Sequence, residues 1–175
     1  MPHHPDLATT VRIRLIEPDE TDAVAAVTEA AYSHDYELPE SYRRSLLDVA
    51  TRAAHDQVWV AEDPATGRIL GTVWTPLPGE RISPLARDGE LDFRLLAVAP
   101  DARGRGIGAA LTRHVIALGR ERGARRVVMN SGSEMVGAHR LYLALGFVRL
   151  TDREGPVEVA PGRFLDLFAF GYDLD

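Results

Sequence analysis

Two residue types are missing from this chain of 175 residues. It contains no cysteine and no lysine, so all 20 basic residues are arginine. Without cysteine there are no disulfides, thiolate nucleophiles or thiolate metal ligands, which fits a reducing compartment and predicts a cytoplasmic protein. Without lysine, the chain has no ε-amine for Schiff-base chemistry.

Long apolar runs are also absent. No stretch of 18 apolar residues predicts a transmembrane helix, and the opening MPHHPDLATT lacks the apolar core of a signal peptide. We expect residues 1–9 to form a flexible tail. His3 and His4 have no further ligands at metal-binding spacing, so we predict no metal site. Length and 45% hydrophobic content predict a single globular domain over residues 10–175.

Charge is unevenly distributed along the sequence. The formal net charge of −6 argues against nucleic-acid binding. Residues 1–100 carry 9 arginines and 17 acids, whereas residues 103–126 carry 7 arginines and one acid. A solvated helix face usually mixes its signs, so this local excess predicts a bound anion nearby.

The hydrophobic pattern switches between periods of two and of 3.6 residues, which predicts an α+β domain. A turn at PATG predicts a hairpin over 57–75, and a loop rich in proline and glycine follows at 76–89. The predicted strands are 10–16, 57–75 as a hairpin, 90–98, 125–130 and two closing strands within 147–174. The predicted helices are 19–33, 40–54, 106–122 and 138–145.

The segment RGRGIG places Gly104, Gly106 and Gly108 at the start of the 106–122 helix. Glycine permits positive φ and close approach of a ligand to the backbone. The first amides of a helix are unpaired and carry the positive end of its dipole, so the turn suits a phosphate. Arg103 and Arg105 add to that attraction. The alternative is a plain strand-to-helix turn.

A dinucleotide fingerprint is formally present at Gly104, Gly106 and Ala109. Its context is wrong for a dinucleotide site, because the four residues APDA separate the end of the preceding strand at Val98 from Arg103. The next strand also ends in Asn130 instead of an acid. A Walker A loop is excluded, because no Gly-Lys-Ser/Thr occurs.

LLAVAPDARGRGIGAALTRHVI (95–116) resembles the acetyl-CoA-binding signature of the GNAT superfamily of N-acetyltransferases, and AHRLYLALGF (138–147) resembles its later helix-and-strand signature. The resemblance implies a GNAT fold: a mixed, mostly antiparallel sheet of about seven strands, flanked by about four helices. Its central parallel strands, here 91–98 and 125–130, would splay apart.

The same resemblance implies where acetyl-CoA binds. The pantetheine arm would pair with the backbone of the strand at 96–98, and the pyrophosphate would lie on the amides of 103–109. Many members have Asn seven residues before the Tyr, where this chain has Met135, so the resemblance leaves the polar contacts to pantetheine to Asn130, Ser131 and Gly132. The implied cofactor-binding residues are Leu96, Ala97, Val98, Arg103, Gly104, Arg105, Gly106, Ile107, Gly108, Ala109 and Asn130.

For catalysis, the resemblance implies a general base at Asp92, with Glu90 as the second choice. On a strand both side chains point the same way, and ordinary surface carboxylates are the alternative. Tyr142 matches the general acid of the family, with a core tyrosine as the alternative. His114 and His139 are interpreted as packing or surface residues.

The acceptor site implied by the family lies at the loops 33–41 and 76–89, with Tyr32, Asp35 and Tyr36 as its predicted binding residues. Acidic and aromatic groups suit a cationic amine. The predicted function is transfer of the acetyl group of acetyl-CoA to a primary amine, small-molecule or peptide, by direct attack in a ternary complex. The alternative is a catalytically weak acetyl-CoA-binding sensor or assembly protein. We predict no nucleic-acid or membrane partner and leave a homodimer open.

Overall fold

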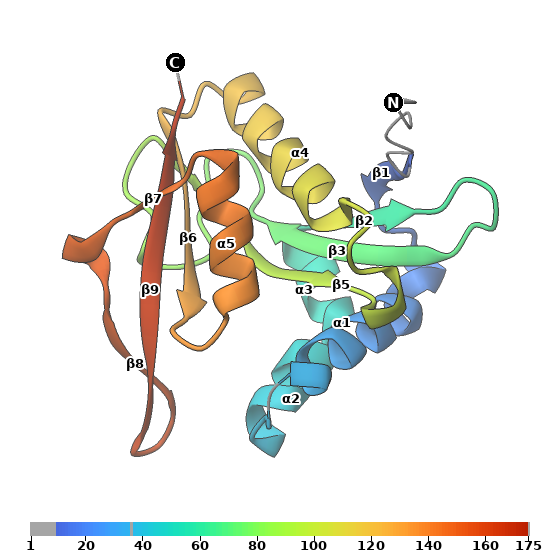
Figure 1. Cartoon of the computed structure of the whole chain (residues 1–175), viewed down its shortest axis with the longest axis horizontal. Coiled ribbons are helices and arrows are strands. Elements are labelled where there is room, and N and C mark those ends of the chain that lie inside the picture. The colour runs from blue at the N-terminus through green and yellow to red at the C-terminus, as the bar shows by residue number, and fades with distance from the viewer. Residues whose placement is uncertain (1–9, 36, 175) are drawn as a thin grey trace, which may run out of the picture.

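Two twisted sheets meet near the middle of the molecule, as Figure 1 shows, with helices packed around them. The protein is described by a computed structural model that covers residues 10–35 and 37–174. The strands are β1 (Arg12–Leu15), β2 (Gln57–Glu62), β3 (Ile69–Thr75), β4 (Glu90–Asp92), β5 (Arg94–Val98), β6 (Arg126–Gly132), β7 (Val148–Arg149), β8 (Gly155–Ala160) and β9 (Arg163–Asp173). The α-helices are α1 (Thr21–Asp35), α2 (Glu40–Leu47), α3 (Val49–His55), α4 (Ile107–Glu121) and α5 (Val136–Leu145), and short 3-10 turns lie at Pro18–Glu20, Pro100–Ala102 and Thr151–Arg153.

The first sheet has the strand order β1-β2-β3-β5 and is antiparallel throughout. The second has the order β4-β6-β9-β7, with β8 paired to β9. Between the strands described, β4 and β6 form the only parallel pair. This arrangement confirms the predicted α+β class and the mostly antiparallel pairing. It differs from the prediction in two respects: the strands form two sheets instead of one, and the described residues contain five α-helices instead of about four.

The strand predicted at 90–98 is divided in the structure. β4 pairs with β6, from Glu90 opposite Arg126 to Asp92 opposite Val128, whereas β5 pairs with β3. Leu95, just past the break, has φ +53°, and it is the one non-glycine residue at positive φ in the described chain. Leu95 lies where the pairing of β5 with β3 shifts register, between Ala97 opposite Thr72 and Arg94 opposite Trp74, as in a β-bulge. The strand thus pairs with β6 as far as Asp92 and with β3 from Arg94 onward. The predicted splaying of the two central parallel strands is therefore confirmed.

Two other predicted elements differ from the structure. The helix predicted at 40–54 ends at Leu47 and restarts at Val49, because Asp48 has ψ 61° and its carboxylate caps the second helix by accepting from Thr51 N–H. The closing segment contains β8, which the prediction missed, since Gly155 and Pro156 weaken the strand pattern.

The main core forms where α4 and α5 cover the junction of the two sheets. Leu111 and Val115 of α4 are fully buried, as is Val127 of β6. Gly119 permits the close approach of α4, because a Cβ there would lie 3.0 Å from Val127 Cγ2. Helices α1–α3 cover the opposite face of the first sheet through two smaller clusters. No described helix is both long and apolar enough to span a bilayer.

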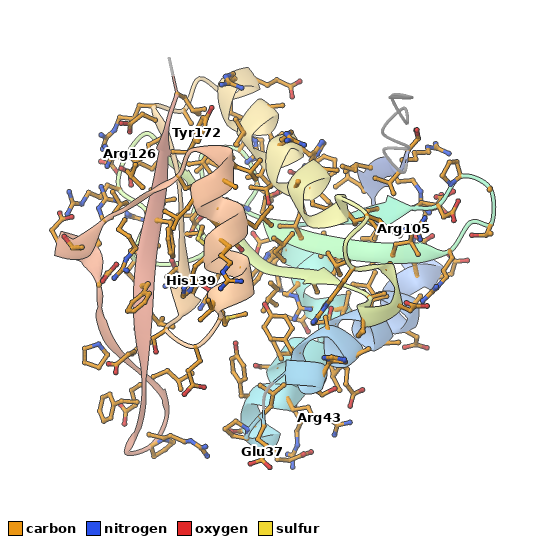
Figure 2. The ribbon with its side chains drawn as sticks, viewed as in Figure 1. Glu37, Arg43, Arg105, Arg126, His139 and Tyr172 are labelled. Atoms are coloured by element: carbon orange, nitrogen blue, oxygen red, sulfur yellow. The ribbon has the colours of Figure 1, made fainter. Side chains whose placement is uncertain are left out.

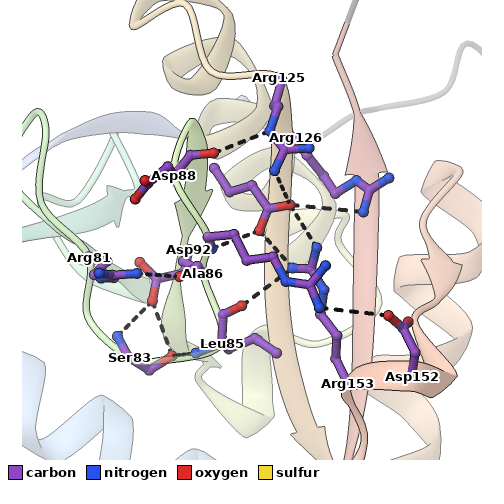
Figure 3. A network of polar contacts seen from close by, with 12 residues as sticks. Arg81, Ser83, Leu85, Ala86, Asp88, Asp92, Arg125, Arg126, Asp152 and Arg153 are labelled. Carbon is purple, nitrogen blue, oxygen red and sulfur yellow. Dashed lines mark hydrogen bonds and ion pairs between the residues drawn. The ribbon is translucent and has the colours of Figure 1, made fainter.

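β4 carries two buried carboxylates that fasten neighbouring segments to the sheet. Glu90, with a fully buried side chain, accepts from Arg153 Nη1 at 2.6 Å and Nη2 at 2.9 Å, and from the backbone N–H of Arg87. Asp92 accepts from the backbone N–H groups of Ile82 and Ser83 at 2.8–3.1 Å. Figure 3 shows this network, with Asp92 facing Ser83 and Arg153 reaching in from the other side. The loop 80–89 is thus tied to β4 at both ends.

Replacing Glu90 by Gln should destabilise the fold by about 3–5 kcal/mol, because the buried Arg153 loses its counter-charge. Burial by itself would raise the pKa of Glu90, but the hydrogen bonds from Arg153 and Arg87 hold that pKa below its usual 4.5. The ionised carboxylate therefore stabilises the fold above pH 4.5, and this contribution is lost as the pH falls through the lower folded pKa. Urea denaturation at a series of pH values measures both effects.

The matched control is Asp152→Asn, at an exposed carboxylate 3.8 Å from Arg87. It should leave the unfolding free energy nearly unchanged. Equal stability of the Glu90→Gln and Asp152→Asn proteins would contradict this account of the network.

Candidate active site

A cavity of about 680 Å³ opens beside the end of β5. Three segments form most of its wall: the end of β5, the loop leading into α4, and the start of α5. β5 is an edge strand of the first sheet, so its free edge faces this space. The cavity therefore offers unpaired strand backbone on one side and a helix amino terminus on another.

The loop into α4 has the conformation that its glycines allow. Gly104 and Gly106 have φ values of +78° and +77°, and Gly106 is the N-cap of α4. The N–H groups of 107–109, in the first turn, have no acceptor within the helix. At Gly108 the constraint is space, because a Cβ there would lie only 3.2 Å from Leu141 Cδ2. Backbone amides and the helix dipole together favour a phosphate at this turn.

Two arginines flank the turn. Arg103 Nη2 donates to the carbonyl of Ala31 at 3.0 Å, which ties the loop to α1. Arg105 lies on the outside of the same loop (Figure 2). Arginine binds phosphate oxygens through charged, directional hydrogen bonds, so these side chains add to the attraction of the amides.

A central cavity of about 100 Å³ adjoins the large one, and Tyr32, Leu96, Met135 and Ala138 line both. Tyr142 of α5 lies at its wall, buried against Phe93, Phe147 and Phe170. Burial raises the pKa of the Tyr142 hydroxyl well above its usual value, so the hydroxyl is protonated at neutral pH. The other polar side chains at this wall are Tyr32, Tyr42, Arg94, Asn130 and Ser131.

A third cavity, of about 340 Å³, lies between α2 and the β8–β9 hairpin. It shares Tyr32, Tyr42, Met135 and Leu167 with the central cavity. Its wall carries three carboxylates and one arginine beside apolar side chains: Glu37, Glu134, Asp166, Arg163, Leu38, Phe164 and Leu165. The three cavities adjoin one another, since Tyr32 and Met135 line all three. Glu37, labelled at the tip of the helices in Figure 2, lies at the wall of the third cavity.

The sequence model of the acetyltransferase (GNAT) domain family matches residues 54–149, more than half of the chain. The chain belongs to the GNAT acetyltransferase family. It is 34% identical over 158 residues to a mycothiol acetyltransferase from Cellulomonas flavigena, a match that covers 85% of this chain and 43% of that protein. It is 32% identical over 109 residues to glucosamine 6-phosphate N-acetyltransferase 1 from Oryza sativa subsp. japonica, covering 62% and 63% of the two chains.

Among solved structures, yncA from Salmonella typhimurium with its cofactor acetyl-CoA matches with a TM-score of 0.64 and 23% identity, over 95% of each chain. This likeness establishes the GNAT fold. The chain spans half or less of the length of the mycothiol acetyltransferases that it matches, from 39% to 50%.

Most cofactor residues expected from the GNAT signature lie around one space. The large cavity is lined by Leu96, Ala97, Val98, Arg103, Gly104, Gly106, Ile107, Gly108 and Ala109. Arg105 is on the same loop but not in the lining, and Asn130 lines the central cavity. Of the predicted acceptor residues, Tyr32 lines all three cavities, whereas Tyr36 and the side chain of Asp35 lie outside the described part of the chain.

The two predicted bases lie elsewhere. Neither Asp92 nor Glu90 lines any of the three cavities, and both carboxylates are occupied by the loop 80–89 and Arg153. In the structure the two carboxylates accept hydrogen bonds from the loop 80–89 and from Arg153, outside the three cavities.

His139, expected to be a packing or surface residue, is buried on α5 and labelled in Figure 2. Its Nε2 lies 3.2 Å from Ser131 Oγ, and its ring lies against Phe168 and Phe170. Ser131 lines the central cavity. The signal was present in the sequence, because residues 139 and 142 lie three apart on one helix face. Within the described residues, no cluster of His, Asp and Glu could hold a metal ion.

Gly106→Ala should weaken coenzyme A binding about 10-fold, because an L-residue at φ +77° is strained and shifts the amides of the turn. Isothermal titration calorimetry measures this. Gly123→Ala is the matched control, since Gly123 ends the same helix at φ +71° with equally open space around it. Both variants should lose similar stability, but only Gly106→Ala should lose affinity. Equal affinity of the two variants would remove the turn from the binding site.

Proposed function

We propose that the protein is an N-acetyltransferase that transfers the acetyl group of acetyl-CoA to a primary amine in a ternary complex. The observation that carries this proposal is the row of three adjoining cavities. The glycine turn before α4 borders the first, acidic side chains border the acceptor-side mouth, and a small polar cavity adjoins both. Two substrates entering from opposite ends would meet at the central cavity.

The large cavity fits acetyl-CoA, which when bound supplies an activated acetyl thioester. The turn at 103–109 would hold the diphosphate through backbone amides and the two arginines. The free edge of β5 at 96–98 would pair with the amide groups of the pantetheine arm. The N–H groups of that edge would also stabilise negative charge as it develops on the thioester oxygen.

The acidic mouth would attract the acceptor as an ammonium ion, which then has to lose a proton. An alkylamine with a pKa near 10.4 is only about one part in a thousand neutral at pH 7.4. Because Asp92 and Glu90 are held away from the cavities, we assign the proton path to Ser131 and His139. The amine proton would pass to Ser131 Oγ while the hydroxyl proton passes to His139 Nε2.

His139 is suited to this role by its environment. Burial lowers the pKa of His139 below its usual 6.5, so the ring is neutral at pH 7 and can accept a proton. A backbone hydrogen bond at Gly132 and the charge of Glu154 act in the raising direction, while Arg149 acts in the lowering direction. Arg149 and Glu154 form an ion pair with each other, which largely cancels their net effect on the ring.

The hydroxyl of Tyr142 would interact with the coenzyme A thiolate as it leaves. The raised pKa of its hydroxyl makes complete proton transfer to a thiolate costly, since a thiol ionises near pH 8.5. We therefore propose that Tyr142 stabilises the sulfur by donating a hydrogen bond to it in the transition state.

The protein should release thiol from acetyl-CoA at a rate that depends on the added amine. A panel of primary amines with acetyl-CoA, followed by a colorimetric thiol reagent, measures this. Coenzyme A should also raise the melting temperature. A raised melting temperature with no amine-dependent release from any acceptor would support the sensor alternative and contradict the enzyme.

His139→Gln should lower kcat by about 10²–10⁴-fold, as expected for loss of a proton acceptor. In the wild type, kcat/KM should fall as the pH drops below 6.5, because protonated His139 cannot accept the amine proton. This acidic limb should be absent from the variant. His55→Gln, at an exposed histidine of α3, is the control and should keep both rate and profile. An unchanged acidic limb in His139→Gln would exclude the proposed path.

A further inference from the structure

Arg94 differs from every other half-buried arginine in the described chain. Six of these seven arginines have an ion pair or a hydrogen bond to a carbonyl, amide or carboxylate oxygen: Arg14, Arg43, Arg52, Arg122, Arg126 and Arg153. Arg94 forms neither with any described residue. It lines the central cavity, one residue before the backbone turns at Leu95.

The guanidinium nitrogens of Arg94 keep some contact with solvent, since none of them is among the described buried atoms that lack a hydrogen-bond partner. The side chain is therefore accessible to a ligand that enters the cavity. The chain has 26 acidic residues and only 20 arginines, so carboxylates are not scarce. Arg94 lies close enough to Tyr42 for its charge to affect the phenol: burial raises the pKa of Tyr42, and the positive charge of Arg94 acts to lower it. Tyr42 lines the same cavity. The central cavity therefore presents a guanidinium and a neutral phenol, both hydrogen-bond donors, to whatever enters it.

The volume of the cavity restricts the anion that these donors can bind. At about 100 Å³ it holds the equivalent of roughly three water molecules, taking about 30 Å³ for each. The acceptor nitrogen must also reach this cavity to meet the thioester. An anionic group bound to Arg94 and the reacting nitrogen are therefore separated by only a few bonds.

We propose that the acceptor is a free amino acid, with its amine and a carboxylate on the same carbon, and that Arg94 binds the carboxylate. This rests on the proposed function and names its substrate class. A planar carboxylate matches the two parallel N–H groups of a guanidinium. Binding the carboxylate would also orient the amine toward the thioester.

The side chain of the amino acid would extend into the 340 Å³ cavity at the mouth. Leu38, Phe164 and Leu165 offer apolar contact there, with Phe164 59% exposed and available to a ligand. This wall carries three carboxylates and one arginine, so its net negative charge disfavours an amino acid whose side chain is acidic. The favoured acceptors are thus amino acids with apolar side chains.

The experiment compares acceptors that differ in the carboxylate alone. Leucine is paired with 3-methylbutylamine and with leucinamide, and phenylalanine with 2-phenylethylamine. The measured quantity is the ratio of kcat/KM within each pair, from thiol release with acetyl-CoA. The wild type should favour the amino acid at least 10-fold. Arg94→Gln should lower that ratio by about 10- to 100-fold, as for loss of a hydrogen bond between charged groups.

Two further variants complete the test. Arg94→Lys keeps the charge without the paired N–H groups and should give an intermediate ratio, which also serves if Arg94→Gln does not fold. Arg113→Gln, at an exposed arginine of α4 outside the three cavities, should leave the ratio unchanged. A wild-type preference for the decarboxylated amines or the amide, or a ratio that Arg94→Gln leaves intact, would overturn the assignment. Absence of thiol release with every amine would instead contradict the proposed enzyme.

Discussion

The separation of β5 from β6 is the constraint on which the rest of the structure depends. The parallel pairing with β6 ends at Asp92, and from Arg94 the chain pairs with β3 of the other sheet. Two strands that stayed paired would leave no opening between them. Because they separate, the free edge of β5, the start of α4 and the inner face of α5 all border a common space.

The place where the two sheets separate must be held together by contacts from neighbouring segments. The core beneath α4 supplies part of these contacts, with Leu91, Phe93 and Val127 buried at the junction. The two carboxylates of β4 supply the rest by holding the loop 80–89 and Arg153 against the strand. The two acidic residues of β4 therefore have a structural task, and the polar groups that face the cavities come from other elements.

Polar side chains at the centre of the cavities come from four parts of the chain: the first two helices, β5, β6 and α5. Tyr42, Arg94, Ser131 and Tyr142 stand far apart in sequence, and none of the first three belongs to the acetyl-CoA signature. Their common feature is that each is polar and at least partly withdrawn from solvent. Of these, Ser131 contacts His139, whereas Arg94 has no ion pair or hydrogen bond with a described residue, which favours a ligand contact at Arg94.

Local sequence by itself determined the order and type of most elements, the glycine turn before α4 and the signature that identifies the family. These depend on short-range effects: hydrophobic period, the φ that glycine permits, and the unpaired amides that begin a helix. Tertiary structure alone decided the direction in which Glu90 and Asp92 point and the division of the 90–98 strand. It also decided the contact of His139 with Ser131 and the isolation of Arg94. Each of these depends on which distant segment packs against the residue, and a one-dimensional pattern does not contain that information.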